Sequence, residues 1–148
     1  MPESTTPSPS TTSLGPDGDA EAEILRLVDD WTRSVRAGDL DAVTARHADD
    51  VVMFDVPPPE AGNRGIDAYR ASWPQFFEYL RSSGHFDLLE VDVTAGDDVA
   101  YVWALLRCGS PEAVAADPDR RLRLTLGLRR DGGRWAIAHE HHSFTDRT

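Results

Sequence analysis

Lysine is absent from this chain, and cysteine occurs only once. All fifteen basic residues are arginine, which excludes Schiff-base chemistry through a lysine. The single Cys108 excludes an internal disulfide and a zinc cluster built on cysteines. Because Cys108 follows the apolar run YVWALLR, we interpret it as a small buried hydrophobic residue rather than a nucleophile.

Long hydrophobic runs and a positive net charge are also missing. No apolar stretch approaches the length of a membrane span, and the N-terminus lacks the basic and apolar regions of a signal peptide, so we expect a cytoplasmic protein. The formal net charge is −11. Such a field repels phosphate backbones and anionic lipid head groups. We therefore expect neither a nucleic-acid nor a membrane partner.

The composition nevertheless supports a folded domain. The chain has 148 residues, of which 40% are hydrophobic, and this length is typical of one domain with a substantial core. Residues 1–19 are dominated by proline, serine, threonine and glycine, which predicts a disordered tail. Residues 20–148 are predicted to form a single domain.

Helical spacing dominates the first half of that domain. Apolar residues recur at this spacing from residue 20 to Gly38, and Asp39 is suited to cap a second, short helix. A third helix is predicted over residues 66–80, with Pro74 kinking or restarting it. The apolar positions are Ile24, Leu27, Val28, Trp31 and Val35 in the first helix, and Ile66, Tyr69, Trp73, Phe76, Phe77 and Leu80 in the third.

Strand patterns occupy the remainder. Residues 48–56, ADDVVMFDV, predict a strand that brings Asp55 to its end, directly before three prolines. After residue 84, alternating segments joined by turns predict an antiparallel meander. The connection 110–121 is long for a hairpin, and we expect it to cover an opening or extend an interface. The order predicts an α+β domain whose curved, mostly antiparallel sheet wraps three N-terminal helices.

The last predicted strand, RWAIAHEHHS, carries a cluster of ionisable side chains. Strict alternation places His139 and His141 on one face with Trp135 and Ile137, and places Glu140 and His142 on the other. A two-residue hairpin loop would place the leucines of the preceding strand beside the Trp135 and Ile137 face, whereas a three-residue loop would shift the pairing and exchange the faces. The pattern therefore leaves open which set faces the core. A metal site would need His139, His141 and a third ligand, namely His47, His85 or Asp55. Structural or interface histidines are our preferred interpretation, without a metal.

The order of these segments resembles the nuclear transport factor two-like superfamily. The resemblance covers residues 20–143 and rests on AGDLD, ADDVVMFD, RGIDAYRASW and WAIAHEHHS. The last two blocks are similar to the SnoaL-like, SgcJ/EcaC-type branch, whose members often lie in bacterial antibiotic and enediyne gene clusters. The resemblance implies a cone-shaped, cystatin-like fold, a small-molecule pocket and a homodimer.

The ketosteroid isomerase branch of this superfamily implies roles for particular residues. Aligning ADD…DVP with its equivalent places Asp55 at the general base, and aligning AGDLD places Trp31 at the tyrosine of the oxyanion hole. The protonated aspartate of the isomerase falls near Leu126, which cannot donate a hydrogen bond. The resemblance therefore implies the pocket without steroid isomerase activity. It also favours Glu140 and His142 as pocket-facing, with His139 and His141 at an outer dimer face.

The resulting hypothesis is a cofactor-free cyclase or isomerase of bacterial secondary metabolism. It would bind a hydrophobic or aromatic small molecule of polyketide type and act on it by proton abstraction. The expected catalytic residues are Asp55, His142 and Glu140, and the expected substrate-binding residues are Trp31, Tyr69, Trp73 and Leu126. The alternative hypothesis is a non-catalytic ligand-binding or assembly protein with the same homodimeric fold.

Overall fold

The first helices of the computed structural model, which describes residues 16–147, follow the apolar spacing closely. Helix α2 spans Pro16–Ala37 and α3 spans Leu40–Thr44. The Asp39 side chain caps α3 by accepting a hydrogen bond from the backbone of Ala42, as the sequence indicated. Helix α2 begins inside the segment 1–19, because proline is well suited to a first helical turn. Residues 1–15 of the expected tail lie outside the described residues.

The third predicted helix is divided into two. Helix α4 spans Ile66–Ala71 and α5 spans Trp73–Leu80, with Ser72 between them. Pro74 lies in the first turn of α5, where its missing N–H costs nothing, so it restarts the helix rather than kinking it. A further helix, α6 (Pro111–Ala116), lies in the connection expected to be a loop, and Ser110 caps it.

One six-stranded sheet contains the described strands. Its order is β2-β1-β6-β5-β4-β3, and the pairing is antiparallel except between β1 and β6. This arrangement confirms the α+β prediction with a mostly antiparallel sheet. The strands are β1 (His47–Phe54), β2 (Asn63–Arg64), β3 (His85–Ala95), β4 (Val99–Gly109), β5 (Leu122–Asp131) and β6 (Arg134–Ser143). Only the short β2 was not expected.

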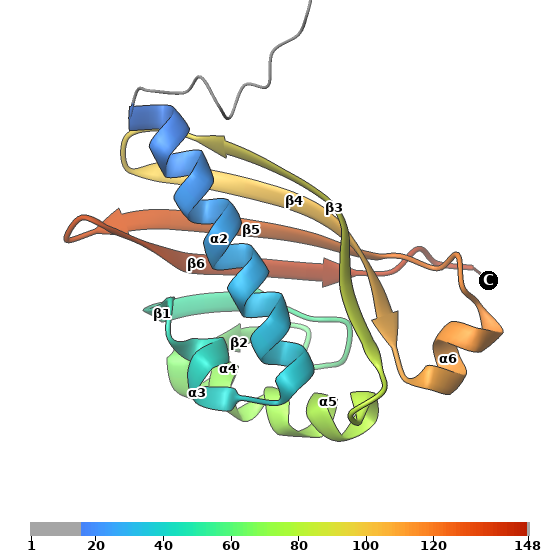
Figure 1. Ribbon diagram of the computed structural model, residues 1–148. Helices are drawn as coiled ribbons and strands as arrows, with labels where there is room; N and C mark the ends of the chain where they lie inside the picture. Colours follow the sequence, from blue (N-terminus) through green and yellow to red (C-terminus); the bar gives the residue numbers. More distant parts are fainter. Residues whose placement is uncertain (1–15, 148) are drawn as a thin grey trace, which may run out of the picture.

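The sheet curves around helix α2, which crosses its concave face. Helices α3 and α4 lie near β1 and β2, and α5 lies near the start of β3 (Figure 1). The apolar stripe of α2, including Ile24, Val28 and Trp31, packs into one core with the inward positions of β4, β5 and β6. Burial of this stripe is the main source of stability for a helix of this kind. No helix in residues 16–147 is long and apolar enough to cross a membrane.

A bulge in β6 changes which side chains face the core. The turn between β5 and β6 has two residues, Gly132 and Gly133, both at positive φ, which glycine adopts readily. Further along, Leu128 pairs with Ile137 but Gly127 pairs with His139, so Ala138 is an extra residue in β6.

Strict alternation was therefore wrong for this strand. The extra residue shifts the side-chain pattern by one position, so both ends of the strand direct their important side chains inward. Trp135, Ile137, Glu140 and His142 are all buried, whereas His141 on the other face is exposed. Without the bulge, the pairs Trp135/Ile137 and Glu140/His142 would lie on opposite faces.

Candidate active site

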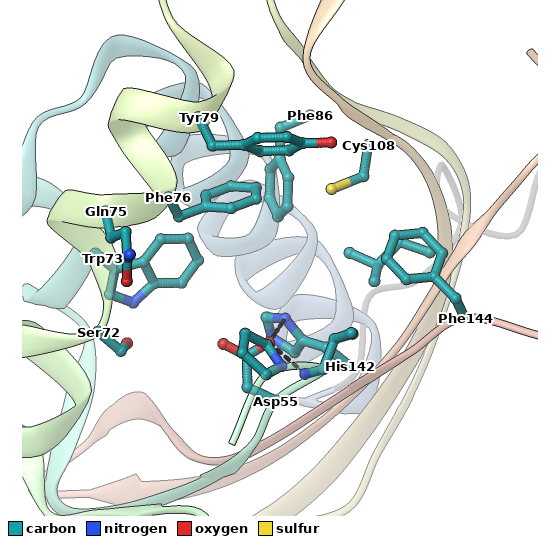
Figure 2. A pocket seen from close by; sticks show the side chains of 13 residues that line it. Asp55, Ser72, Trp73, Gln75, Phe76, Tyr79, Phe86, Cys108, His142 and Phe144 are labelled. Carbon is teal, nitrogen blue, oxygen red and sulfur yellow. Dashed lines mark hydrogen bonds and ion pairs between the residues drawn. The ribbon is translucent and has the colours of Figure 1, made fainter. Parts of the chain in front are cut away.

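A cavity of about 440 Å³ opens between helix α5, the bend of β3 and β4, and the ends of β1 and β6 (Figure 2). Its volume lies within the usual range for small-molecule pockets, about 300–1,000 Å³. Most of its wall is aromatic or aliphatic. The apolar lining residues are Val56, Pro57, Trp73, Phe76, Tyr79, Phe86, Cys108, Leu122 and Phe144, and the polar ones are Asp55, Ser72, Gln75 and His142.

His142 and Asp55 meet at one end of this cavity (Figure 2). The Nδ1 atom of His142 lies 3.6 Å from Oδ1 of Asp55, which is an ion-pair distance and longer than a hydrogen bond. The His142 side chain is only 5% exposed, whereas that of Asp55 is 24% exposed. The pair thus combines a carboxylate open to the cavity with an almost fully buried imidazole.

Behind His142, the buried carboxylate of Glu140 accepts three hydrogen bonds. Its Oε1 accepts from His142 Nε2 at 2.9 Å, and its Oε2 accepts from His47 Nε2 at 2.5 Å and from the Tyr69 hydroxyl at 2.6 Å. The Tyr69 oxygen in turn accepts from Trp31 Nε1 at 3.2 Å. Because an ionised carboxylate can only accept, both imidazoles must carry hydrogen on Nε2, and the Nδ1 atom of His142 is left facing Asp55.

Burial and hydrogen bonding oppose each other in setting the charges here. Burial by itself raises the pKa of Glu140, but hydrogen bonds from His142 and His47, with the charges of both, outweigh it and hold that pKa at about 2. Burial lowers the pKa of His142, yet the hydrogen bond and charge of Glu140, and then the charge of Asp55, raise it above its usual range. The favoured state is a carboxylate and an imidazolium in direct contact.

The structure separates the expected substrate-binding residues. Trp73 lines the cavity, but Trp31, Tyr69 and Leu126 are not among the described residues that line it. Trp31 packs edge-on against Trp73, with ring centroids 6.1 Å apart, and lies behind it. Tyr69 is fully buried beside Glu140, and Leu126 is a core residue paired with Glu140 across β5 and β6. These three therefore support the site from behind the cavity wall.

The expected catalytic residues divide in a similar way. Asp55 and His142 line the cavity, whereas Glu140 is fully buried and reaches the cavity only through His142. His47 was expected only as a candidate metal ligand, although it is the third donor to Glu140. Its role depends on a contact across 93 sequence positions, which no local pattern could indicate.

His139 and His141 lie on the opposite face of β6. The Nδ1–H of His139 donates to the Val52 carbonyl at 2.7 Å, and the Phe54 ring packs edge-on against both imidazoles. Within residues 16–147 no group of three histidine, cysteine, aspartate or glutamate side chains is arranged to hold a metal ion. His139 thus combines a hydrogen bond with ring packing, and His141 makes a ring contact with Phe54.

Comparison with protein families agrees with this architecture. The SnoaL-like domain matches residues 24–147, which is most of the chain. This chain belongs to the SnoaL-like family. Solved structures place the SnoaL-like chain among proteins with the NTF2-like, cystatin-like fold, which confirms the fold expected from the resemblance. No curated protein matches the chain at a significant level.

Three similar solved structures illustrate the range of sequence identity and structural similarity. An NTF2-like protein of unknown function from Pseudomonas putida KT2440 is 33% identical, with 90% of this chain and 92% of that chain covered and a TM-score of 0.78. An NTF2-like protein with a cystatin-like fold from Novosphingobium aromaticivorans is 20% identical, with coverage of 88% and 84% and a TM-score of 0.70. A candidate ketosteroid isomerase from Parabacteroides distasonis is 22% identical, with coverage of 83% and 86% and a TM-score of 0.64.

Proposed function

We propose that this SnoaL-like protein is a cofactor-independent acid–base enzyme that moves a proton on a hydrophobic ring compound. The observation that carries the proposal is the position of His142, held from behind by the buried Glu140 and facing Asp55 at the end of an apolar cavity. A titratable pair with a charged partner at a pocket wall is typical of catalytic sites.

The geometry supports one division of labour between the two residues. The Asp55 carboxylate removes an acidic proton from the carbon beside a ligand carbonyl, and the electron pair moves onto the carbonyl oxygen. The Nδ1–H of the His142 imidazolium donates to that oxygen. In a ligand with a double bond between the β- and γ-carbons, Asp55 returns the proton to the γ-carbon of the dienolate, and the double bond moves to the α,β position. One preorganised donor of this kind lowers the barrier by about 2–4 kcal/mol.

His142 takes the donor role that Leu126 cannot. Ketosteroid isomerases are a known case in which a protonated aspartate donates a hydrogen bond to the enolate. Leu126 carries no donor and is buried behind the cavity wall. The position of His142 therefore supports proton transfer in which the imidazolium, rather than an aspartic acid, donates to the enolate. Glu140 is a positioning residue that holds this imidazolium.

The biological setting is proposed from resemblance and surface chemistry. The similarity of RGIDAYRASW and WAIAHEHHS to the SgcJ/EcaC-type branch supports a polyketide-type substrate in bacterial secondary metabolism, including enediyne pathways. A homodimer is supported by the outer sheet face, where Tyr101 is 51% and Trp103 is 40% exposed near His139 and His141. Exposed aromatic patches of this kind mark interaction surfaces.

Deuterium exchange tests the proposal without knowledge of the natural substrate. The probe is 2-tetralone, a bicyclic ketone with acidic α-hydrogens, incubated in D2O and followed by NMR. The wild-type protein should accelerate exchange above buffer. Because a general base contributes about 10²–10⁴-fold, Asp55→Asn should reduce the protein-dependent exchange by about a hundredfold or more. Asp92→Asn, on an exposed outer position of β3, is the matched control and should leave it unchanged.

Two results would contradict this proposal. Equal exchange by the wild type and Asp55→Asn would remove Asp55 as the base. Binding of the ketone by the wild type without any exchange would favour the second candidate function, a non-catalytic ligand-binding or assembly protein. The exposed aromatic sheet face is the observation that favours that second function.

A further inference from the structure

The cavity is polar at two separate ends. Asp55 and His142 form one end, and Figure 2 shows the hydroxyl of Tyr79 directed across the opposite end, toward Cys108. Aromatic rings, among them Trp73 and Phe76, line most of the space between the two ends, and the polar side chains of Ser72 and Gln75 lie beside them on one side of the cavity. The wall between the ends therefore offers apolar contact to a flat ligand body.

The hydroxyl of Tyr79 has a free hydrogen-bonding capacity. It has no hydrogen-bond partner among residues 16–147, and the residue is 47% exposed at the cavity rim. Its position is nevertheless restricted, because the ring packs on Phe76 with centroids 6.0 Å apart. The oxygen also rests against Gly109, where an added Cβ would lie 3.5 Å away. A held but unpaired hydroxyl is suited to meet a polar atom of a ligand.

The charges around the cavity disfavour an anionic ligand. Among the thirteen residues that line it there is no arginine, and His142 is the one basic group. Glu140 already pairs with that imidazole and Asp55 faces its other ring nitrogen, so the one basic group that lines the cavity already has carboxylate partners. Burial raises the pKa of the Cys108 thiol to about 12, so this neighbour of Tyr79 is neutral. A carboxylate or phosphate ligand would thus enter without an unpaired cation to receive it.

We infer that the cavity selects uncharged, flat ring compounds that carry an oxygen function at both ends, with Tyr79 as the residue that recognises the second oxygen. One oxygen meets Asp55 and His142, and the other accepts from or donates to the Tyr79 hydroxyl. The inference rests on the proposed function in one respect only, namely which end of the ligand reacts. Tyr79 is a specificity residue in this arrangement and takes no part in proton transfer.

Calorimetric binding of three naphthalene probes tests this inference. The probes are 2-naphthol, 2,6-dihydroxynaphthalene and 6-hydroxy-2-naphthoate, measured with the wild type, Tyr79→Phe and Tyr101→Phe. The second hydroxyl should improve binding to the wild type about fivefold, the effect of one net hydrogen bond between neutral groups. Tyr79→Phe should bring that preference below about twofold, because it removes only the hydroxyl. Tyr101→Phe, on the outer sheet face, should keep the full preference.

The naphthoate provides the test of charge and should bind at least about tenfold more weakly than the dihydroxy probe, because it desolvates a charge without gaining a cation. An unchanged preference in Tyr79→Phe, an equally tight naphthoate, or no binding by any probe would overturn the inference. The readout is affinity, so its failure is distinct from that of the exchange assay. Selective binding without deuterium exchange would contradict the proposed function and leave the ligand class standing.

Discussion

Replacement of Glu140 by glutamine is the sharpest test of the buried network. Glutamine has nearly the same shape but no charge, so it cannot hold the imidazolium of His142 in the same way. Glu140 is fully buried and accepts hydrogen bonds from His47, Tyr69 and His142. The substitution therefore removes the negative charge to which all three of these side chains donate.

The expected loss of stability follows from the acidity of the group. A carboxyl with a pKa of about 2 when folded and near 4.5 when unfolded stabilises the fold by about 3 kcal/mol once it is ionised in both states. This value agrees with the roughly 3–5 kcal/mol of stability that is lost when one partner of a buried ion pair is removed. We expect Glu140→Gln to lower the free energy of unfolding by about 3 kcal/mol at pH 6.

The dependence on pH has a definite sign. The pKa of Glu140 is lowered on folding, so its contribution is present above about pH 4.5 and is lost as the pH falls toward about 2. The pKa of His142 is raised on folding, so its contribution is present below its ordinary value of 6.5 and is lost as the pH rises through the folded value. The difference between wild type and Glu140→Gln should therefore be largest between about pH 4.5 and 6.5.

Urea unfolding across this pH range provides the assay. Glu90→Gln, an exposed residue of β3, serves as the control and should match the wild type. The NMR titration of the His142 ring should shift to lower pH in Glu140→Gln, because its charged partner is gone. A difference below about 0.5 kcal/mol at pH 6, or an equal difference at pH 3 and pH 6, would refute the reasoning.

Two further predictions concern Cys108 and Ala138. Because burial raises the thiol pKa of Cys108 to about 12, a thiol reagent at pH 8 should label the folded protein far more slowly than the protein in urea, and equal rates would contradict this placement. Deletion of Ala138 removes the bulge and forces either Trp135 and Ile137 or Glu140 and His142 outward. We expect that variant to lose cooperative unfolding in a calorimetric scan, whereas Ala136→Gly, within the same strand, should keep it.

Much of the fold was predictable because its signals are local. The spacing of Ile24, Val28 and Trp31 along α2 reflects one helix face, and Asp39 is a typical cap residue. The restart at Pro74 also follows from the chemistry of a single residue. The placement of Asp55 at a strand end depended on a short β-branched run followed by prolines.

The site was less predictable because its parts meet across the chain. His47 and Tyr69 both donate to Glu140 from distant segments, and Phe86 and Phe144 reach the cavity from different strands or their ends. Trp31 has the helical spacing of a core residue, which says nothing of whether it stands in front of or behind a cavity wall. Such placements follow from packing between elements and leave no pattern in any one segment.

The sequence by itself determined the class of this protein: an acidic α+β domain with an amphipathic first helix, a carboxylate at the end of its first strand and an ionisable cluster in its last. Only the tertiary structure decided how that cluster is used. One extra residue, Ala138, reverses the alternation and directs Glu140 and His142 inward with Trp135 and Ile137. A bulge depends on the pairing between two strands, so its position is set by the partner strand and the core that both cover.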